Sequence, residues 1–136
     1  MRALSKLRLL LVGIVAVAAT LTGQNKPPVS TAIPNYDLKT EVRIRGLVLD
    51  SNDHPCPISG GLGSHLLLKT QDGTIEVHLG PTKFVNEYEL TLVRGNTVEV
   101  LGSRLFFEGR DALLAREITR GEETFVFRDA NGKPVW

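Results

Sequence analysis

Cysteine is nearly absent from this sequence, since Cys56 is the one cysteine in 136 residues. The chain therefore cannot form an internal disulfide, and its fold must be held together by its core. Cys56 is inert, paired with another molecule, or a metal ligand. The haem-attachment motif C-x-x-C-H is also absent. Residues 59–65, SGGLGSH, lack the G-K-[ST] ending of a phosphate loop, and they precede a predicted strand instead of opening a helix.

Long hydrophobic runs are missing as well, apart from one at the N-terminus. Three basic residues precede residues 9–23, which are uncharged and mostly apolar. This run is shorter than the roughly 20 residues that a membrane-spanning helix needs. The order of charge, apolar run and polar stretch predicts a signal peptide over residues 1–23, cleaved after Ala18 or just before Gln24. We expect a periplasmic or extracellular protein with no retained membrane span; an uncleaved leader anchored in the inner membrane is the alternative.

Excess positive charge is lacking once the leader is removed. The whole chain has a formal net charge of +1, but the leader holds three basic and no acidic residues, which leaves 13 Lys and Arg against 15 Asp and Glu. Nucleic-acid binding depends on neutralising phosphates, so a mature charge of about −2 argues against DNA or RNA as partner. Residues 24–40, with three prolines, predict an extended linker, and residues 41–136 a single domain.

Alternating apolar and polar residues predict strands through most of this domain. Residues 41–50 form one such strand, and Gly46 at its middle suggests a bend. Residues 51–64 are rich in Pro, Gly and Ser and predict a long loop. A hairpin then follows around Asp72 and Gly73, a dipeptide that suits a tight turn.

The register of this hairpin decides which side chains share a face. With Asp72 and Gly73 as the turn, Lys69 faces Glu76 as an exposed ion pair, and Leu67 faces His78. His65 and His78 then lie diagonally, as surface side chains, at roughly 7–8 Å. One face enters the core: Leu66, Leu68, Ile75, Val77 and Leu79. The other is the predicted ligand face: His65, Leu67, Lys69, Glu76 and His78.

The remaining pattern predicts a short helix behind Thr82 as N-cap, and then more strands. Residues 97–107, broken near Gly102, pair with residues 111–118. A short strand over residues 124–128 leads to a turn and to Trp136, which packs on the body of the domain. This order is that of a mainly β OB-fold: a five-stranded Greek-key barrel with one short helix between strands 3 and 4, plus a short C-terminal hairpin. A plain β-sandwich is the alternative.

Four stretches resemble small exported bacterial OB-like domains of the magnetosome MamS/MamX type. They are GSHLLLKTQDGTIEVHLGP, RGNTVEVLGSR, DALLAREITRG and FRDANGKPVW, and together they cover most of residues 41–136. The resemblance implies the OB-fold and an accessory role near iron-mineral crystal maturation, in which some relatives use haem bound through C-x-x-C-H. Because that motif is absent here, haem binding is not carried over.

The sharpest chemical hypothesis is a metal site. His54 and Cys56 lie in the predicted loop that borders the ligand face of His65 and His78, and imidazole and thiolate suit Zn, Cu or Fe(II). Ordinary surface histidines with a loop cysteine are the competing interpretation. We expect a non-enzymatic binding or accessory module of the cell envelope, without a resident cofactor unless a transition metal binds, whose partner is an envelope protein or a small ligand.

Two further site hypotheses carry less support from the residues. Ser64 beside His65 suggests a hydrolase, but neighbouring strand residues point to opposite faces and no nucleophile-elbow motif surrounds the serine. Arg43, Arg45 and Lys69 suggest a nucleic-acid patch. The aromatic residues that would stack on bases are Phe106, Phe107, Phe125 and Phe127, of which several must belong to the core.

Overall fold

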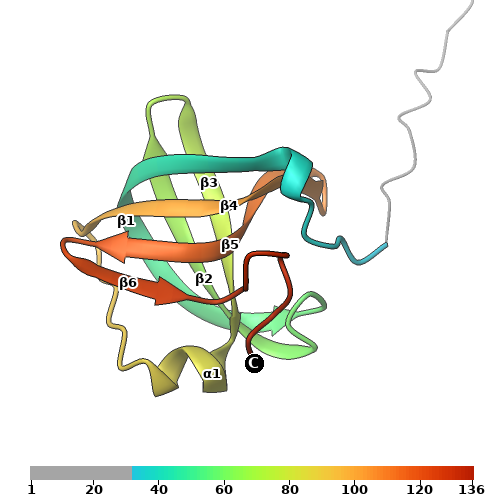
Figure 1. Cartoon of the computed structure of the whole chain (residues 1–136). Helices are drawn as coiled ribbons and strands as arrows, with labels where there is room; N and C mark the ends of the chain where they lie inside the picture. Colours follow the sequence, from blue (N-terminus) through green and yellow to red (C-terminus); the bar gives the residue numbers. More distant parts are fainter. Residues whose placement is uncertain (1–31) are drawn as a thin grey trace, which may run out of the picture.

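The computed structural model describes residues 32–136, which fold into a mainly β domain (Figure 1). Its elements are a 3-10 turn η1 (Leu38–Thr40), strands β1 (Glu41–Cys56), β2 (Gly61–Thr70) and β3 (Gly73–Pro81), helix α1 (Thr82–Glu87), and strands β4 (Thr97–Phe107), β5 (Arg110–Arg120) and β6 (Glu123–Val126). The predicted signal peptide, residues 1–23, lies outside the described residues. Within residues 32–136, none of the helices has the length and apolar character to cross a membrane.

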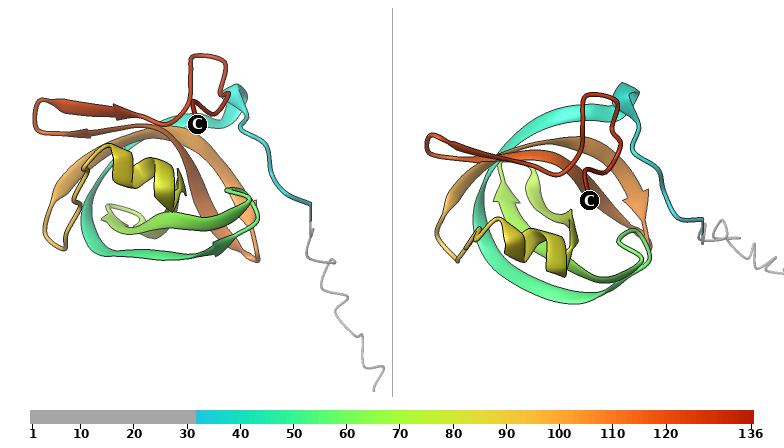
Figure 2. Two further views of the ribbon diagram at one scale, coloured as in Figure 1. Left: turned by 90° about the horizontal axis from the view of Figure 1, so that it is seen from below. Right: turned by 60° about the horizontal axis from the view of Figure 1, so that its bottom comes forward.

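All six strands belong to one sheet, in the order β3-β2-β1-β4-β5-β6. Neighbours in this order are antiparallel, and β3 also pairs in parallel with β5 through Val77 and Leu113. The sheet therefore curls round until strands from its two sides meet, and α1 lies across one end (Figure 2). The expected mainly β class, the helix between the third and fourth strands and the short last strand are all confirmed.

The predicted loop over residues 51–64 is wrong, because β1 continues to Cys56 and β2 begins at Gly61. Asp53 pairs with Ser64 across this extension. Proline is compatible with the strand here because β1 pairs with β4 only as far as Leu47. Beyond that point β1 has β2 on one side alone, and a proline in an edge position costs no ladder hydrogen bond.

The register predicted for the β2–β3 hairpin is also wrong, because the turn lies one residue earlier in the chain than predicted. Thr70 pairs with Gly73, so Gln71 and Asp72 form the turn, and Gly73 takes the positive φ of 123°. The hydroxyl of Thr70 accepts a hydrogen bond from the Asp72 N–H (3.2 Å), which favours this turn over the predicted one.

Two consequences of the register matter for the site. His65 and His78 are directly opposite each other, where the diagonal arrangement was expected. Lys69 faces Thr74, so the predicted Lys69–Glu76 ion pair does not form.

The core fills the inside of the curled sheet, and the residues predicted to face it are buried. Its members are Val48, Leu66, Leu68, Ile75, Val77, Leu79, Val85, Leu92, Val98, Val100, Leu113, Ala115, Ile118 and Phe127. The predicted N-cap is wrong, because Pro81 occupies that position and Thr82 is the first residue of α1. Trp136 packs as expected, with its ring 5.7 Å from that of Phe84.

Gly102 of β4 lies close to the backbone of β5, and the register shifts beside it, at the predicted break. A Cβ at Gly102 would lie 2.4 Å from the carbonyl oxygen of Leu114. We expect Gly102→Ala to lower the free energy of unfolding by about 1–3 kcal/mol, because backbone must move to make room. Gly61→Ala is the control, since no atom lies within 4 Å of its Cβ position. Equal denaturation midpoints for the two variants would contradict this account.

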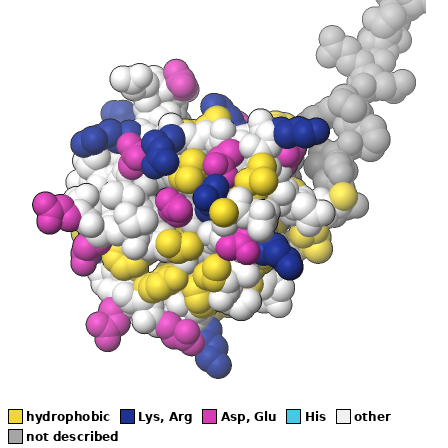
Figure 3. All heavy atoms as spheres, in the orientation of Figure 1, with side chains coloured by type: hydrophobic (Ala, Val, Ile, Leu, Met, Phe, Trp, Pro, Cys, Tyr) yellow, Lys and Arg dark blue, Asp and Glu magenta, His cyan; other side chains and the backbone are white. Residues whose placement is uncertain are grey.

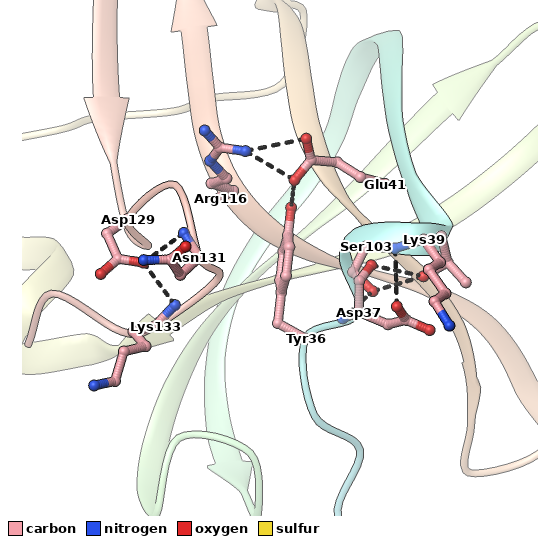
Figure 4. A network of polar contacts seen from close by, with 10 residues as sticks. Tyr36, Asp37, Lys39, Glu41, Ser103, Arg116, Asp129, Asn131 and Lys133 are labelled. Atoms are coloured by element: carbon pink, nitrogen blue, oxygen red, sulfur yellow. Dashed lines mark hydrogen bonds and ion pairs between the residues drawn. The ribbon is translucent and has the colours of Figure 1, made fainter.

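A polar network ties the segment before β1 to the sheet (Figure 4). The Tyr36 hydroxyl donates to Glu41 Oε2 at 2.6 Å, and Arg116 Nη1 donates to both Glu41 oxygens at 3.0 and 2.9 Å. The hydrogen bond from Tyr36, followed by the hydrogen bond and charge of Arg116, lowers the pKa of Glu41 below its ordinary value of 4.5. The ionised carboxylate is therefore more stable in the folded state than in the unfolded state.

This lowered pKa predicts a pH-dependent contribution to stability. It is fully present above pH 4.5 and is lost as the pH falls through the lower pKa of the folded state. We expect Glu41→Gln to cost about 1–2 kcal/mol at pH 7, and the difference from the parent chain to shrink in acid. Glu99→Gln, which removes a more exposed pair with Arg43, should cost less than about 1 kcal/mol. A difference for Glu41→Gln that is constant from pH 7 to pH 3 would contradict the assignment.

Candidate metal centre

Strand alternation brings four chemically active side chains to one face. Residues two apart in a strand point the same way. Asn52 of β1 pairs with His65 of β2, so His54 and Cys56 project from the same face as His65. His78 of β3 pairs with His65 on its other side. The register shift between Ser64 and His65 is a bulge of the kind that re-aims side chains beside functional sites.

Gly63 provides the space in which these side chains meet. A Cβ at this position would lie 3.0 Å from the Cβ of Cys56 and 3.2 Å from Cε1 of His65. It would also lie 2.7 Å from Ser59 Oγ, so any larger residue here would have to displace neighbouring side chains. The sequence predicted that Gly63 lies in a loop. In the structure it lies in strand β2, where its lack of a side chain leaves room for Cys56 and His65.

Cys56, His65 and His78 form a buried set of three metal donors. Their side chains are 4%, 1% and 6% exposed, and one donor atom from each lies within 4.8 Å of the others. Cys56 Sγ is 3.5 Å from His78 Nδ1. That distance is close to the sulfur-to-nitrogen separation expected when both atoms bind one ion with bonds of about 2.3 and 2.0 Å. The geometry therefore fits a transition metal without large movement of these two donors.

His65 is the unusual member of the set. Neither ring nitrogen has a hydrogen-bond partner of good geometry among the described residues, although both are buried. A buried polar atom without a partner costs about 1–3 kcal/mol. Burial, followed by the neighbouring His54, lowers the pKa of His65 and keeps the ring neutral. A buried imidazole in its neutral form has the protonation state that binds a metal ion.

His78 lies between Glu76 and Cys56. Its Nε2 is 3.2 Å from Glu76 Oε1, and its Nδ1 is 3.5 Å from Cys56 Sγ. Burial, then the neighbouring His65, His54 and Arg110, lowers the pKa of His78 to about 4. A carboxylate behind a histidine fixes its tautomer and raises its strength as a ligand, as in many zinc sites.

His54 stacks on His65 instead of converging edge-on with it. The two ring centroids are 3.7 Å apart and the planes differ by 6°. His65 and His78 are nearly perpendicular, with centroids 4.6 Å apart and planes at 80°. A second set, His54, His65 and Glu76, also has donor atoms within 4.8 Å of one another. Because an imidazole binds metals in its ring plane, parallel His54 and His65 do not suit one ion.

The structure thus gathers all four predicted metal ligands, but not as surface histidines. Both His65 and His78 are buried, which corrects the expectation of an exposed pair. On the predicted ligand face, Leu67 and Glu76 are half-buried and Lys69 is exposed. The sequence analysis placed Glu76 on this face but did not predict that its carboxylate lies beside His78. The spacing of two residues on one strand could have indicated this proximity, because such residues point to the same side.

The other site hypotheses separate from this cluster. The Ser64 hydroxyl donates to Asp53 Oδ1 at 2.6 Å and lies 3.2 Å from Thr82 Oγ1. Of the phenylalanines considered for base stacking, Phe127 is fully buried and Phe106 is 74% exposed. Phe107 is 7% exposed and its ring lies 5.9 Å from that of His78, so it packs against one member of the candidate ligand set.

Comparison with known proteins shows the family to which the chain belongs. The model of the MamS/MamX magnetosome protein family matches residues 40–125. No curated protein matches the chain significantly. The crystal structure of the ZRD-deleted mutant of TiaS in complex with agmatine is similar, with a TM-score of 0.43 and 23% identity. That match covers 63% of this chain and 25% of the TiaS chain.

Proposed function

Because this chain belongs to the MamS/MamX magnetosome protein family, we propose that it is a magnetosome-type accessory domain that binds a transition metal. The ion is held by Cys56, His65 and His78. The observation that carries this proposal is the buried His65, whose two nitrogens lack good partners beside a thiol and a second imidazole. A bound ion would satisfy one of those nitrogens and offset the cost of burying it.

The proposal extends to fold and location. The strand order, the β3–β5 pairing and the helix after β3 support a five-stranded OB-fold barrel with β6 as an added edge. The apolar run behind basic residues at the N-terminus supports export to the periplasm or beyond. We propose a non-enzymatic role, since the Ser64 hydroxyl is engaged with Asp53 and Thr82.

Nucleic acid is not the partner in this proposal. Arg43 pairs with Glu99, and Arg104 pairs with Asp111, so two of the basic side chains near the predicted patch are neutralised. Figure 3 shows acidic and basic side chains interspersed on the face that it draws. A nucleic-acid surface is dominated by positive charge. An envelope protein or small ligand remains the proposed partner of the domain as a whole.

The direct experiment is titration of the purified chain with Zn(II) and, without oxygen, with Cu(I). We expect one ion per chain, and at least about 100-fold weaker binding in Cys56→Ser. Thr74→Ala, an exposed change on the same hairpin, is the matched control and should bind as the parent does. Absence of stoichiometric binding of either metal, or equal binding by Cys56→Ser, would overturn the proposed function.

Glu76→Gln tests the carboxylate behind His78. The amide keeps the shape of the side chain but removes the negative charge 3.2 Å from His78 Nε2. We expect metal affinity to fall by about 10–100-fold, with the fold retained. Glu87→Gln, an exposed change on α1, should leave affinity unaltered. Unchanged affinity in a folded Glu76→Gln variant would remove Glu76 from the site.

A further inference from the structure

We infer that the ion at this centre is copper(I), bound by three donors: Cys56 Sγ, His78 Nδ1 and one nitrogen of His65. This inference rests on the proposed function and specifies its ligand. Three features of the cluster carry it: the number of well-directed donors, their chemical softness and the charge that burial permits.

The number of donors comes first. Within residues 32–136, the fourth-donor candidates from this cluster are His54 and Glu76. The His54 ring is parallel to His65 at 3.7 Å, so an ion in the plane of His65 lies well outside the plane of His54. Glu76 Oε1 lies 3.2 Å from His78 Nε2, and Glu76 Oε2 lies 3.6 Å from the Arg110 guanidinium. Both candidates are therefore committed elsewhere, and three donors remain.

Three donors suit copper(I) better than zinc. Structural zinc sites are almost always four-coordinate, and catalytic ones keep an open position for water. Here the three donors are at most 6% exposed, which disfavours a site completed by solvent. Thiolate is a soft ligand that favours copper(I) and zinc over hard cations such as Mg²⁺ and Ca²⁺, so the number of donors and the charge decide between these two metals.

The net charge of the bound ion and its thiolate also favours copper(I). Binding removes the proton of the Cys56 thiol to solvent as the copper–sulfur bond forms, and copper stays in the +1 state, so no electron is transferred. One thiolate with Cu(I) gives a neutral unit, whereas Zn(II) leaves one positive charge in a buried place. The carboxylate of Glu76 is shared with Arg110 and does not cancel that charge. Burying an uncompensated charge is costly.

The test has two parts, both on the purified full chain kept without oxygen. Competition between Cu(I) and Zn(II) measures which metal the site binds more tightly. X-ray absorption at the copper edge measures the number and type of atoms bound to copper. We expect Cu(I) to displace Zn(II), and a shell of one sulfur and two nitrogens. His54→Ala should bind Cu(I) within about threefold of the parent, while Cys56→Ser should lose at least about 100-fold.

The outcomes separate this inference from the proposed function. Preferred binding of Zn(II), with a four-coordinate shell that is lost in His54→Ala, overturns copper(I) but leaves a metal-binding protein. A four-coordinate copper shell also overturns the inference. Failure of either metal to bind the folded parent chain overturns both.

Discussion

His65→Leu is expected to stabilise the metal-free chain and to abolish its metal binding. The variant replaces a buried ring whose nitrogens lack good partners by an apolar side chain of similar size. Removing an unsatisfied buried polar group should raise the free energy of unfolding by about 1–3 kcal/mol. The same change removes a ligand, so metal should no longer raise the denaturation midpoint. Functional sites in natural proteins often lower the stability of the folded state in this way.

The measurement is denaturant unfolding of parent and variant, each with and without metal. His54→Leu is the control, because His54 is less buried and its Nδ1 lies 3.2 Å from the carbonyl oxygen of Pro55. It should stabilise the metal-free chain less than His65→Leu. If His65→Leu instead destabilised the metal-free chain, the imidazole would make stabilising contacts in the folded state, which would contradict the prediction.

Phe127→Ala is expected to cost the most stability of the variants considered, about 3–5 kcal/mol. Phe127 is fully buried, its ring lies 5.8 Å from Tyr88 and 6.4 Å from Phe84, and its N–H donates to the Arg116 carbonyl. The substitution leaves a cavity between the last strand and α1.

Phe106 provides a matched control of the same residue type. Its side chain is 74% exposed, so Phe106→Ala should change the free energy of unfolding by no more than about 0.5 kcal/mol. Phe127→Leu should cost less than Phe127→Ala, since it keeps most of the volume. Similar denaturation midpoints for Phe106→Ala and Phe127→Ala would contradict the assignment of Phe127 to the core.

Much of the fold was predictable from the alternation of side chains. Leu66, Leu68, Ile75 and Val77 follow a strict period of two, and burial confirms their shared face. The continuation of β1 to Cys56 was not predictable in this way. Its residues are mostly exposed and polar, and a proline there reads as a loop until the partner strand shows that the position is an edge.

The site was predictable in its members but not in its environment. Alternation placed His65 and His78 on one face, and they are there. The error was a turn shifted to Gln71 and Asp72, which changed a diagonal pair into a directly opposite one. Burial of both rings depends on the extension of β1 and on Phe107, which lie far apart in the sequence. No local pattern contains that information.

The most direct measurement is a crystal structure of the copper-loaded chain with anomalous scattering recorded at the copper edge. We expect one peak at bonding distance, about 2.0–2.3 Å, from Cys56 Sγ, His78 Nδ1 and a nitrogen of His65, with His54 still stacked on His65. A peak elsewhere on the chain, or none in a crystal whose solution contained copper in excess, would contradict a metal centre between β1, β2 and β3.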